Sequence, residues 1–389
     1  MDNLMFVDQL KLRASYGVVG NDDLSSYYPW RATYAVNNNG EPGYVQSSLG
    51  NRELTWETSN NFDVAAEFSL FKGRLDGSAE YFHRVSSDLL FSVPKPISSG
   101  VENVDVNAGS MYNKGVELLL NGVVLSTDNF KMSLTGNATF IKNKITELPL
   151  DPYPTSVYKI EEGHSRYDFW LRQWYKVNPD NGYNLFKADL ENYEFAEGEL
   201  MEFDGVQYTE NVEKSVYEFS GSAMPKVTGG IGANLSWKNF NLKLNFYYQL
   251  GGEFYDNTYK SLLDGSNLYW AQHKDLLKRW RKPGDVTNIG RVTAGTDITN
   301  IEASSSTRWL VSSDMIELTN INLSYTIPQR ILKPRKISEA VVYFSADNAL
   351  LFTARTGLYP RRNFQSGYIA NGDVYAPSRV ISFGLSITF

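Results

Sequence analysis

The sequence predicts an all-β protein, an antiparallel transmembrane β-barrel with short periplasmic turns and long extracellular loops. Three observations predict this fold class. Ten segments alternate between apolar and polar residues over ten or more positions, whereas strands of soluble domains usually stop at about 5–6 residues. The links between these segments are long and short in turn. The chain also ends in "RVISFGLSITF", an amphipathic strand with an aromatic residue at its tip.

The predicted strands follow one another along the chain. In "NFKMSLTGNATFIKNK", Met132, Leu134 and Phe140 share one face, and Lys131 and Ser133 lie on the other. Because side chains alternate between faces along a strand, each segment has one apolar and one wettable face. "KVTGGIGANLSWKNFNLKLNFYYQLGG" repeats the pattern twice. The other segments begin near Leu10, Phe62, Leu75, Lys114, Ile321 and Val341, and the last is the terminal one.

The links place the long loops at one end of the predicted sheet. In an antiparallel meander every second link falls on the same edge, and long loops on one edge are typical of bacterial outer-membrane barrels. A soluble β-sandwich has the same two faces, but strand length combined with one-sided loops favours the barrel. Short links lie at 72–73, 126–128 and 238–239, an intermediate one at about 328–337, and long ones at about 18–55, 92–109, 149–225, 257–312 and 352–377.

Composition limits the classes of partner. Lys and Arg number 37 against 44 Asp and Glu, a formal charge of −7 without a dense basic run, which argues against nucleic acid. Aromatic residues make up 14% of the chain, which fits a sheet or a membrane interface. The sequence has no Cys, which excludes a disulfide scaffold and a thiolate site. No apolar stretch approaches the roughly 18 residues of a spanning helix, so membrane residence would require a barrel.

Five stretches together carry a family resemblance. They are "LKLRASYGVVGNDDL", "LTWETSNNFDVAAEFSLFKGRLDGSAEYFHRVSSDLLF", "NAGSMYNKGVELLLNG", "MPKVTGGIGANLSWKNFNLKLNFYYQLGG" and the terminal "SFGLSITF". In this order they resemble the carboxy-terminal part of a SusC/RagA-family TonB-dependent outer-membrane transporter of Bacteroidetes. The resemblance implies a longer protein with a 22-stranded barrel around an amino-terminal plug. It also implies a SusD-like surface lipoprotein as a lid, and energy from TonB acting on the plug.

The resemblance sets the expected domain content. Residues 1–389 would be the carboxy-terminal portion of a receptor β-barrel domain, about 10 strands of a probable 22. No plug, TonB box or signal peptide precedes Met1, which fits the downstream part of a longer protein better than a cytoplasmic one. An open half-barrel would leave two unpaired edges in lipid, so we do not expect this chain to fold alone.

The terminal strand has a further implied role. In outer-membrane barrels generally, such a strand resembles the signal that the barrel insertion machinery reads, and it pairs with the first strand to close the barrel. Outer-membrane lipid and this machinery are therefore implied partners. The residues that match the pattern are Phe383, Leu385, Ile387 and Phe389, whose simpler role is packing against lipid.

No catalytic constellation or metal motif stands out, and we expect neither an enzyme nor a cofactor. "VNPDNGYNLF" lacks the spaced carboxylates of a calcium loop and is predicted to turn at Pro179 and Gly182. The acidic stretch 190–205 is predicted to be a solvated loop, with divalent-ion binding as the alternative. The histidines are scattered and have no second ligand at metal-binding spacing: His83, His164 and His273.

The two largest loops contain aromatic residues that could contact a ligand. Aromatic rings stack on the apolar faces of sugars, so a glycan transporter would hold such residues above its lumen. The alternative is that they pack the loops together or against the lid protein. The candidates are Trp170, Trp174, Tyr175, Trp270 and Trp280. A short helix is predicted in "HKDLLKRWRKPGDVTN", before the Pro-Gly pair.

The function that the resemblance implies is TonB-energised import of a nutrient across the outer membrane, together with a SusD-like lipoprotein. The loop aromatics place an oligosaccharide ahead of a peptide as the substrate. A passive porin or structural barrel without a plug is the alternative, and a soluble β-rich adhesin or carbohydrate-binding module is a third class. The reading frame upstream of Met1 would separate them.

Overall fold

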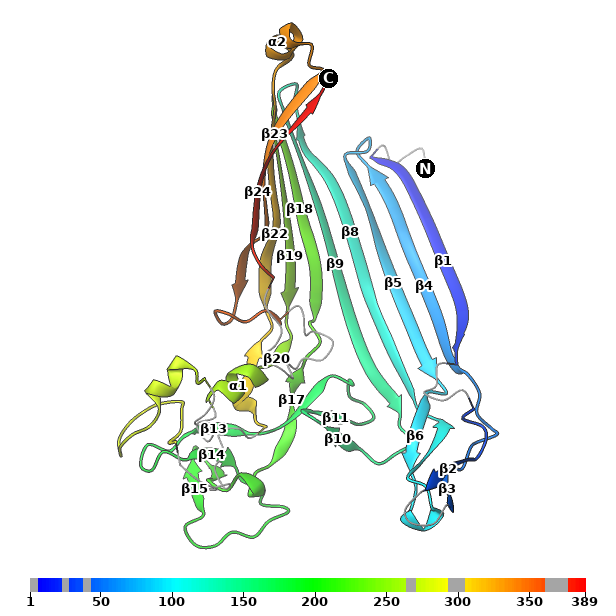
Figure 1. The fold of residues 1–389 in the computed structure, drawn as a ribbon, viewed down its shortest axis with the longest axis vertical. Coiled ribbons are helices and arrows are strands. Elements are labelled where there is room, and N and C mark those ends of the chain that lie inside the picture. Colours follow the sequence, from blue (N-terminus) through cyan, green and yellow to red (C-terminus); the bar gives the residue numbers. More distant parts are fainter. Residues whose placement is uncertain (1–5, 23–27, 38–42, 264–270, 293–304, 361–376) are drawn as a thin grey trace.

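Ten long strands form one antiparallel sheet in which each pairs with the next long strand along the chain (Figure 1). The computed structural model describes residues 6–22, 28–37, 43–263, 271–292, 305–360 and 377–389. All ten strands predicted from the alternation are confirmed. In spatial order they are β1 (Val7–Asn21), β4 (Glu57–Leu70), β5 (Leu75–Ser87), β8 (Ser110–Ser126), β9 (Phe130–Glu147), β18 (Val227–Trp237), β19 (Phe240–Leu250), β22 (Met315–Thr326), β23 (Glu339–Thr353) and β24 (Val380–Thr388).

The sheet is a curved wall with two edges. Figure 1 shows the long strands side by side above the folded loops, with β1 at one side and β24 at the other. Within the described residues, β1 is paired only with β4 and β24 only with β23. The strands have 9 to 18 residues, and a transmembrane strand needs about 9–11. The wall is therefore tall enough to cross a bilayer.

One face of the wall is apolar and exposed. Leu12 is 74% exposed, Tyr16 69% and Phe383 78%, although burying such side chains is worth about 1.5–3 kcal/mol each. Their neighbours across the ladder are apolar as well, for example Val342 opposite Leu385. Exposure of this extent along whole strands is expected only where lipid replaces water.

The other face is polar and holds an ion network near β1. The Arg13 Nε donates to a Glu67 carboxylate oxygen at 3.1 Å, and the Lys11 ammonium lies 3.2 Å from the other oxygen. Arg13 also contacts the Glu80 carboxylate. These residues alternate with the apolar ones on β1, β4 and β5, so this ion network lies on one side of the sheet.

The short links meet at one end of the wall. Lys72 and Gly73 turn with φ of 57° and 72°, and Lys238 turns with φ of 53°, a left-handed conformation that fits tight strand connections. The intermediate link contains α2 (Gln329–Leu332) and η6 (Lys333–Arg335). The prediction of one-sided loops is confirmed, because the long links lie at the opposite end (Figure 1).

Two of the long links form hairpins beside the wall. The first holds β2 (Thr33–Asn37) and β3 (Gly43–Ser48), which pair with each other. The second holds β6 (Leu90–Pro94), η1 (Ile97–Ser99) and β7 (Asn103–Asn107). The sequence predicted both links as loops, and their strands of 5–6 residues are too short for a period-2 pattern to stand out.

The two largest links fold into a structured unit, and we call the described parts of 149–225 and 251–312 the loop body. One small sheet has the order β10–β11–β12–β17 and another β13–β14–β16–β15. The strands are β10 (Tyr153–Thr155), β11 (Tyr158–Ile160), β12 (Asp168–Arg172), β13 (Trp174–Val177), β14 (Asn184–Lys187), β15 (Leu200–Phe203), β16 (Val206–Thr209), β17 (Tyr217–Ser222), β20 (Glu253–Tyr255) and β21 (Leu310–Ser312). The helices are η2 (Val212–Lys214), α1 (Asn257–Leu263), η3 (Lys274–Lys278) and η5 (Thr307–Trp309).

Among the described residues, no helix has the length and apolar character that crossing a membrane requires. The predicted short helix in 273–288 is confirmed as the 3-10 helix η3, which ends before Pro283.

Candidate functional site

The loop body has a single hydrophobic core to which both large loops contribute. Its buried members from the first loop are Val157, Phe169, Leu171 and Ala223, and those from the second are Tyr255, Leu263, Ile289 and Trp309. Since residues of both loops pack into this one cluster, the two loops bury apolar surface together. The two loops therefore form one platform at the end of the wall.

The loop that follows β23 is tied to the same platform. The Arg355 guanidinium pairs with the buried carboxylate of Asp256 and lies 4.1 Å from the Tyr259 ring centroid. Asp256 also accepts the Tyr259 backbone N–H at 2.9 Å, at the start of α1. The Tyr359 hydroxyl donates to the buried Glu317 carboxylate on the polar face of β22. These contacts hold the platform against the wall.

Trp280 connects the two large loops. Its indole N–H donates to the Pro179 carbonyl at 2.9 Å. Gly182 has φ of +80°, and a Cβ added there would lie 2.5 Å from the Trp280 ring. The turn predicted at Pro179 and Gly182 is therefore confirmed, and the indole covers it. Trp280 packs the loops together, which is the structural alternative for this residue.

Trp174 is also engaged inside the loop body. Its indole N–H donates to the Asn184 side chain at 2.9 Å, and the Arg308 guanidinium lies 5.4 Å from its ring centroid. Burial lowers the pKa of Arg308 to about 9. Trp174 and Arg308 are both half-buried, so this contact packs one part of the indole ring.

Trp170 and Tyr175 lie on two different small sheets. On β12, Phe169 and Leu171 enter the core while Trp170 lies on the opposite face, with its ring centroid 4.9 Å from that of Phe219. On β13, the Tyr175 ring stacks on Tyr208 at 4.3 Å. Both rings are half-buried. The aromatic candidates thus do not converge on one cleft, and Trp270 lies outside the described residues.

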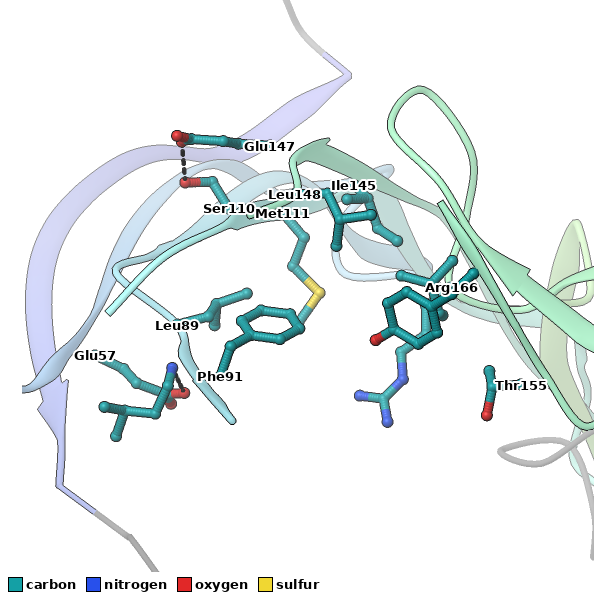
Figure 2. Close-up of a pocket in the computed structure, with 13 residues that line it drawn as sticks. Glu57, Leu89, Phe91, Ser110, Met111, Ile145, Glu147, Leu148, Thr155 and Arg166 are labelled. Carbon is teal, nitrogen blue, oxygen red and sulfur yellow. Dashed lines mark hydrogen bonds between the residues drawn. The ribbon is translucent and has the colours of Figure 1, made fainter. Parts of the chain in front are cut away.

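A pocket that the sequence did not reveal lies where the loops meet the wall. It has a volume of about 480 Å³, within the size range of small-ligand sites. Figure 2 shows Phe91 and Met111 on one side of this space, with Ile145, Leu148 and Arg166 on the other. The lining is completed by Glu57, Leu89, Leu90, Ser110, Glu147, Tyr153, Thr155 and Ile160.

Arg166 is held over this pocket by the wall itself. Asn143 on β9 is 6% exposed, and its side-chain oxygen accepts the Ser165 hydroxyl and the Arg166 backbone N–H, both at 3.0 Å. Among the described residues, no carboxylate lies within ion-pair distance of the Arg166 guanidinium. Glu57 is occupied differently, because it accepts the Leu90 backbone N–H at 2.9 Å. The pocket, which we call the rim pocket, therefore combines apolar side chains with the Arg166 guanidinium and the carboxylates of Glu57 and Glu147.

The acidic stretch and the histidines have local partners. Glu199 pairs with Lys214 at 2.8 Å, and the Asp189 carboxylate accepts the Asn192 amide. His164 stacks on Phe219, and His273 accepts the Asp275 backbone N–H at the start of η3. In the described parts of the chain, no three His, Cys, Asp or Glu side chains gather as a metal site.

The apolar side chains of the terminal strand β24 are exposed. Phe383 lies opposite Phe344 on β23, with ring centroids 5.2 Å apart. The predicted insertion residues form one exposed row on that face: Phe383, Leu385, Ile387 and Phe389.

A wall of long antiparallel strands, with one apolar face, one polar face and its long loops at one end, defines the class of bacterial outer-membrane β-barrels. A family model described as "TonB dependent receptor-like, beta-barrel" matches residues 3–348, and the chain belongs to this family. It is a family of receptors and transporters, and the predicted resemblance to SusC/RagA-type transporters is confirmed.

The relatives are much longer than this chain. TonB-dependent receptor P3 of Formosa agariphila is 27% identical over 372 residues, covering 92% of this chain and 36% of the relative. TonB-dependent receptor SusC of Bacteroides thetaiotaomicron is 24% identical over 402 residues, covering 98% and 38%. A structure titled as the RagAB peptide importer in the "closed-closed" state is 25% identical, with a TM-score of 0.79, over 99% of this chain and 41% of that one. The chain thus spans about two fifths of the length of such proteins.

Proposed function

We propose that this chain supplies part of the barrel wall and the external platform of a TonB-energised importer of nutrients in the bacterial outer membrane. The observation that carries the proposal is the loop body. The long loops are folded around a shared core at one end of a wall whose inner face is polar. A folded platform above a polar lumen suits capture of a solute before it passes through the barrel.

The proposed substrate is an oligosaccharide or a peptide. The described aromatic candidates all make packing contacts and are all half-buried, so each has part of its ring open for sugar stacking: Trp170, Trp174, Tyr175 and Trp280. The RagAB structures are named for peptide transport, which supports the peptide as a substrate class. The rim pocket adds apolar side chains together with one guanidinium and two carboxylates, a lining that can contact either class.

The proposed partners follow the same family. A SusD-like lipoprotein would close over the loop body, and TonB would act through a plug that belongs to the longer protein. The side chains at the top of the loop body would contact this lid, and those of the polar face would contact the plug, for which the Arg13 network offers charged groups.

The test is growth of the source bacterium after deletion of the gene. We expect the deletion strain to lose growth on one class of oligosaccharide or peptide as the sole nutrient, and depletion of TonB to reproduce that loss. Complementation with the whole gene should restore growth. Uptake that continues unchanged without TonB would contradict the importer and support a passive pore.

A further inference from the structure

Basic residues line up across three strands on the outer, apolar face of the wall. His83 on β5 lies directly opposite Lys114 on β8, and Lys114 lies directly opposite Lys142 on β9. Lys144 follows two positions later on β9 and therefore shares the same face. We call His83, Lys114, Lys142 and Lys144 the basic row.

The side of the sheet is fixed by neighbouring contacts. Tyr81, Val116 and Phe140 form the adjacent cross-strand row, two residues nearer the middle of the strands, and all three are exposed. Residues two apart on a strand point to the same side. The basic row therefore lies on the face that carries the apolar band, and not on the polar inner face.

No acidic side chain compensates the basic row. Within the part of the chain that the structure describes, Lys114, Lys142 and Lys144 enter no ion pair. The contacts of the row are with an aromatic ring: the Lys114 ammonium lies 5.0 Å from the Tyr112 centroid, and the His83 ring lies 5.6 Å from it. Like charges directly opposite one another across a ladder are destabilising, so an anion from outside the chain would stabilise this arrangement.

The position of the row indicates which anion. Two residues along a strand are about 6–7 Å, so the row lies just beyond the apolar band, toward the long loops. In the orientation proposed above, on which this inference depends, that is the level of the headgroups in the outer leaflet. Lysine ammonium groups are compact charges that suit phosphate oxygens, and basic clusters at membrane level attract anionic headgroups.

We propose that the basic row is a binding site for the phosphate of an outer-leaflet phosphoglycolipid. Lys114 and Lys142 donate to the phosphate oxygens, Lys144 adds charge at the next row, and Tyr112 lies beside the sugar to which the phosphate is attached. The apolar band of Tyr81, Val116 and Phe140 packs against the acyl chains.

The experiment compares lipid retained by the full-length protein, purified in mild detergent from its own outer membrane and analysed by native mass spectrometry. In the double variant Lys114→Gln/Lys142→Gln, we expect retention of phosphoglycolipid to fall about 30-fold, the factor expected for loss of two lysines near an anionic surface. The matched control is Lys131→Gln/Lys243→Gln, which removes two lysines from the polar face of β9 and β19 and should leave lipid retention unchanged. Equal retention in the two double variants overturns the proposal.

Two further measurements fix the source of the phosphate and protect against misfolding. Vesicles that contain the phosphoglycolipid should raise the melting temperature of the delipidated protein, whereas its dephosphorylated form and inorganic phosphate alone should not. An equal rise with inorganic phosphate overturns the lipid assignment. If the Gln variant does not assemble, Lys114→Arg/Lys142→Arg keeps both charges and should retain lipid, and its loss of lipid contradicts the proposal. Nutrient uptake reports separately on the proposed function, since neither lysine faces the lumen.

Discussion

At the scale of single residues, replacing Trp280 distinguishes a packing role of its indole from a ligand-binding role. We expect Trp280→Ala to destabilise the loop body by about 3 kcal/mol, because the indole covers the turn at Pro179 and Gly182 and makes a hydrogen bond there. Hydrogen exchange over 178–184 measures the loss. Leu277→Ala is the control, since Leu277 is exposed in the neighbouring helix and should change little. Loss of substrate binding with unchanged exchange would restore the ligand role.

Among the described residues, the Arg166 guanidinium in the rim pocket has no carboxylate within ion-pair distance. We expect Arg166→Gln to weaken uptake of carboxylate-bearing substrates about tenfold and of neutral ones hardly at all, because a charge-assisted hydrogen bond contributes about 1.5–3 kcal/mol. Competition assays with paired neutral and acidic substrates measure the ratio. Arg335→Gln, in η6 at the opposite end of the wall, is the control. An equal effect on both substrate classes would mean that the guanidinium does not discriminate between acidic and neutral substrates.

These two residues show where sequence reasoning stops at this scale. Aromatic composition selected Trp280, but its partner at Pro179 is 101 residues away, and pairing over that distance depends on how two loops dock. Arg166 gave no signal at all, because its position depends on Asn143, a polar residue on a strand where the pattern was read for its apolar face. Only the fold brings these residues together.

At the scale of elements, the anchoring of η3 depends on pH. The ammonium of Lys278 and the hydroxyl of Tyr259 hydrogen-bond the Asp275 carboxylate and lower its pKa, and burial raises the pKa of Tyr259 to about 12. A carboxylate with a lowered pKa stabilises the fold above its unfolded value, and this contribution is lost as pH falls through the folded value. We expect exchange over 271–279, corrected for intrinsic rate, to be slow at pH 7 and to quicken below about pH 4. In the variant Asp275→Asn, amide exchange over 271–279 should be fast both at pH 7 and below about pH 4.

Substitutions at two adjacent positions of β24 compare the two faces of the wall directly. We expect Phe383→Lys to destabilise the membrane-inserted barrel by about 2 kcal/mol, because a lysine on the lipid face is costly near the membrane midplane. Ser382→Lys, one residue earlier on the polar face, should be nearly neutral. Unfolding of the full-length protein from lipid vesicles in urea measures both. Similar losses would contradict the assignment of faces.

The ten wall strands could be predicted from sequence, and the strands of the loops could not. A wall strand such as β9 repeats its alternation from Phe130 to Phe140, which no helix pattern imitates. In the loop body, β13 and β14 have four residues each and are held by contacts with other segments. The register shifts beside Phe246 and Leu318 also went unforeseen, because a bulge changes pairing without disturbing the apolar pattern of its strand.

At the scale of the whole molecule, the two open edges of the wall determine whether this chain can fold alone in a membrane. Among the described residues, β1 and β24 each have one partner, and lipid offers nothing to an unpaired backbone N–H or C=O, at a cost of several kcal/mol for each group. The relatives are more than twice as long as this chain.

We therefore expect residues 1–389, expressed alone and refolded with lipid vesicles, to give no heat-modifiable barrel on electrophoresis, whereas the whole gene product gives one. We expect the loop body to fold in the isolated chain, because its core is built from its own two loops and needs no edge partner. Hydrogen exchange on the isolated chain should consequently show protection at Phe169 and Trp309 and little protection along β1. A stable barrel formed by these residues alone would mean that the two edges pair with each other, and the wall would be a complete small pore.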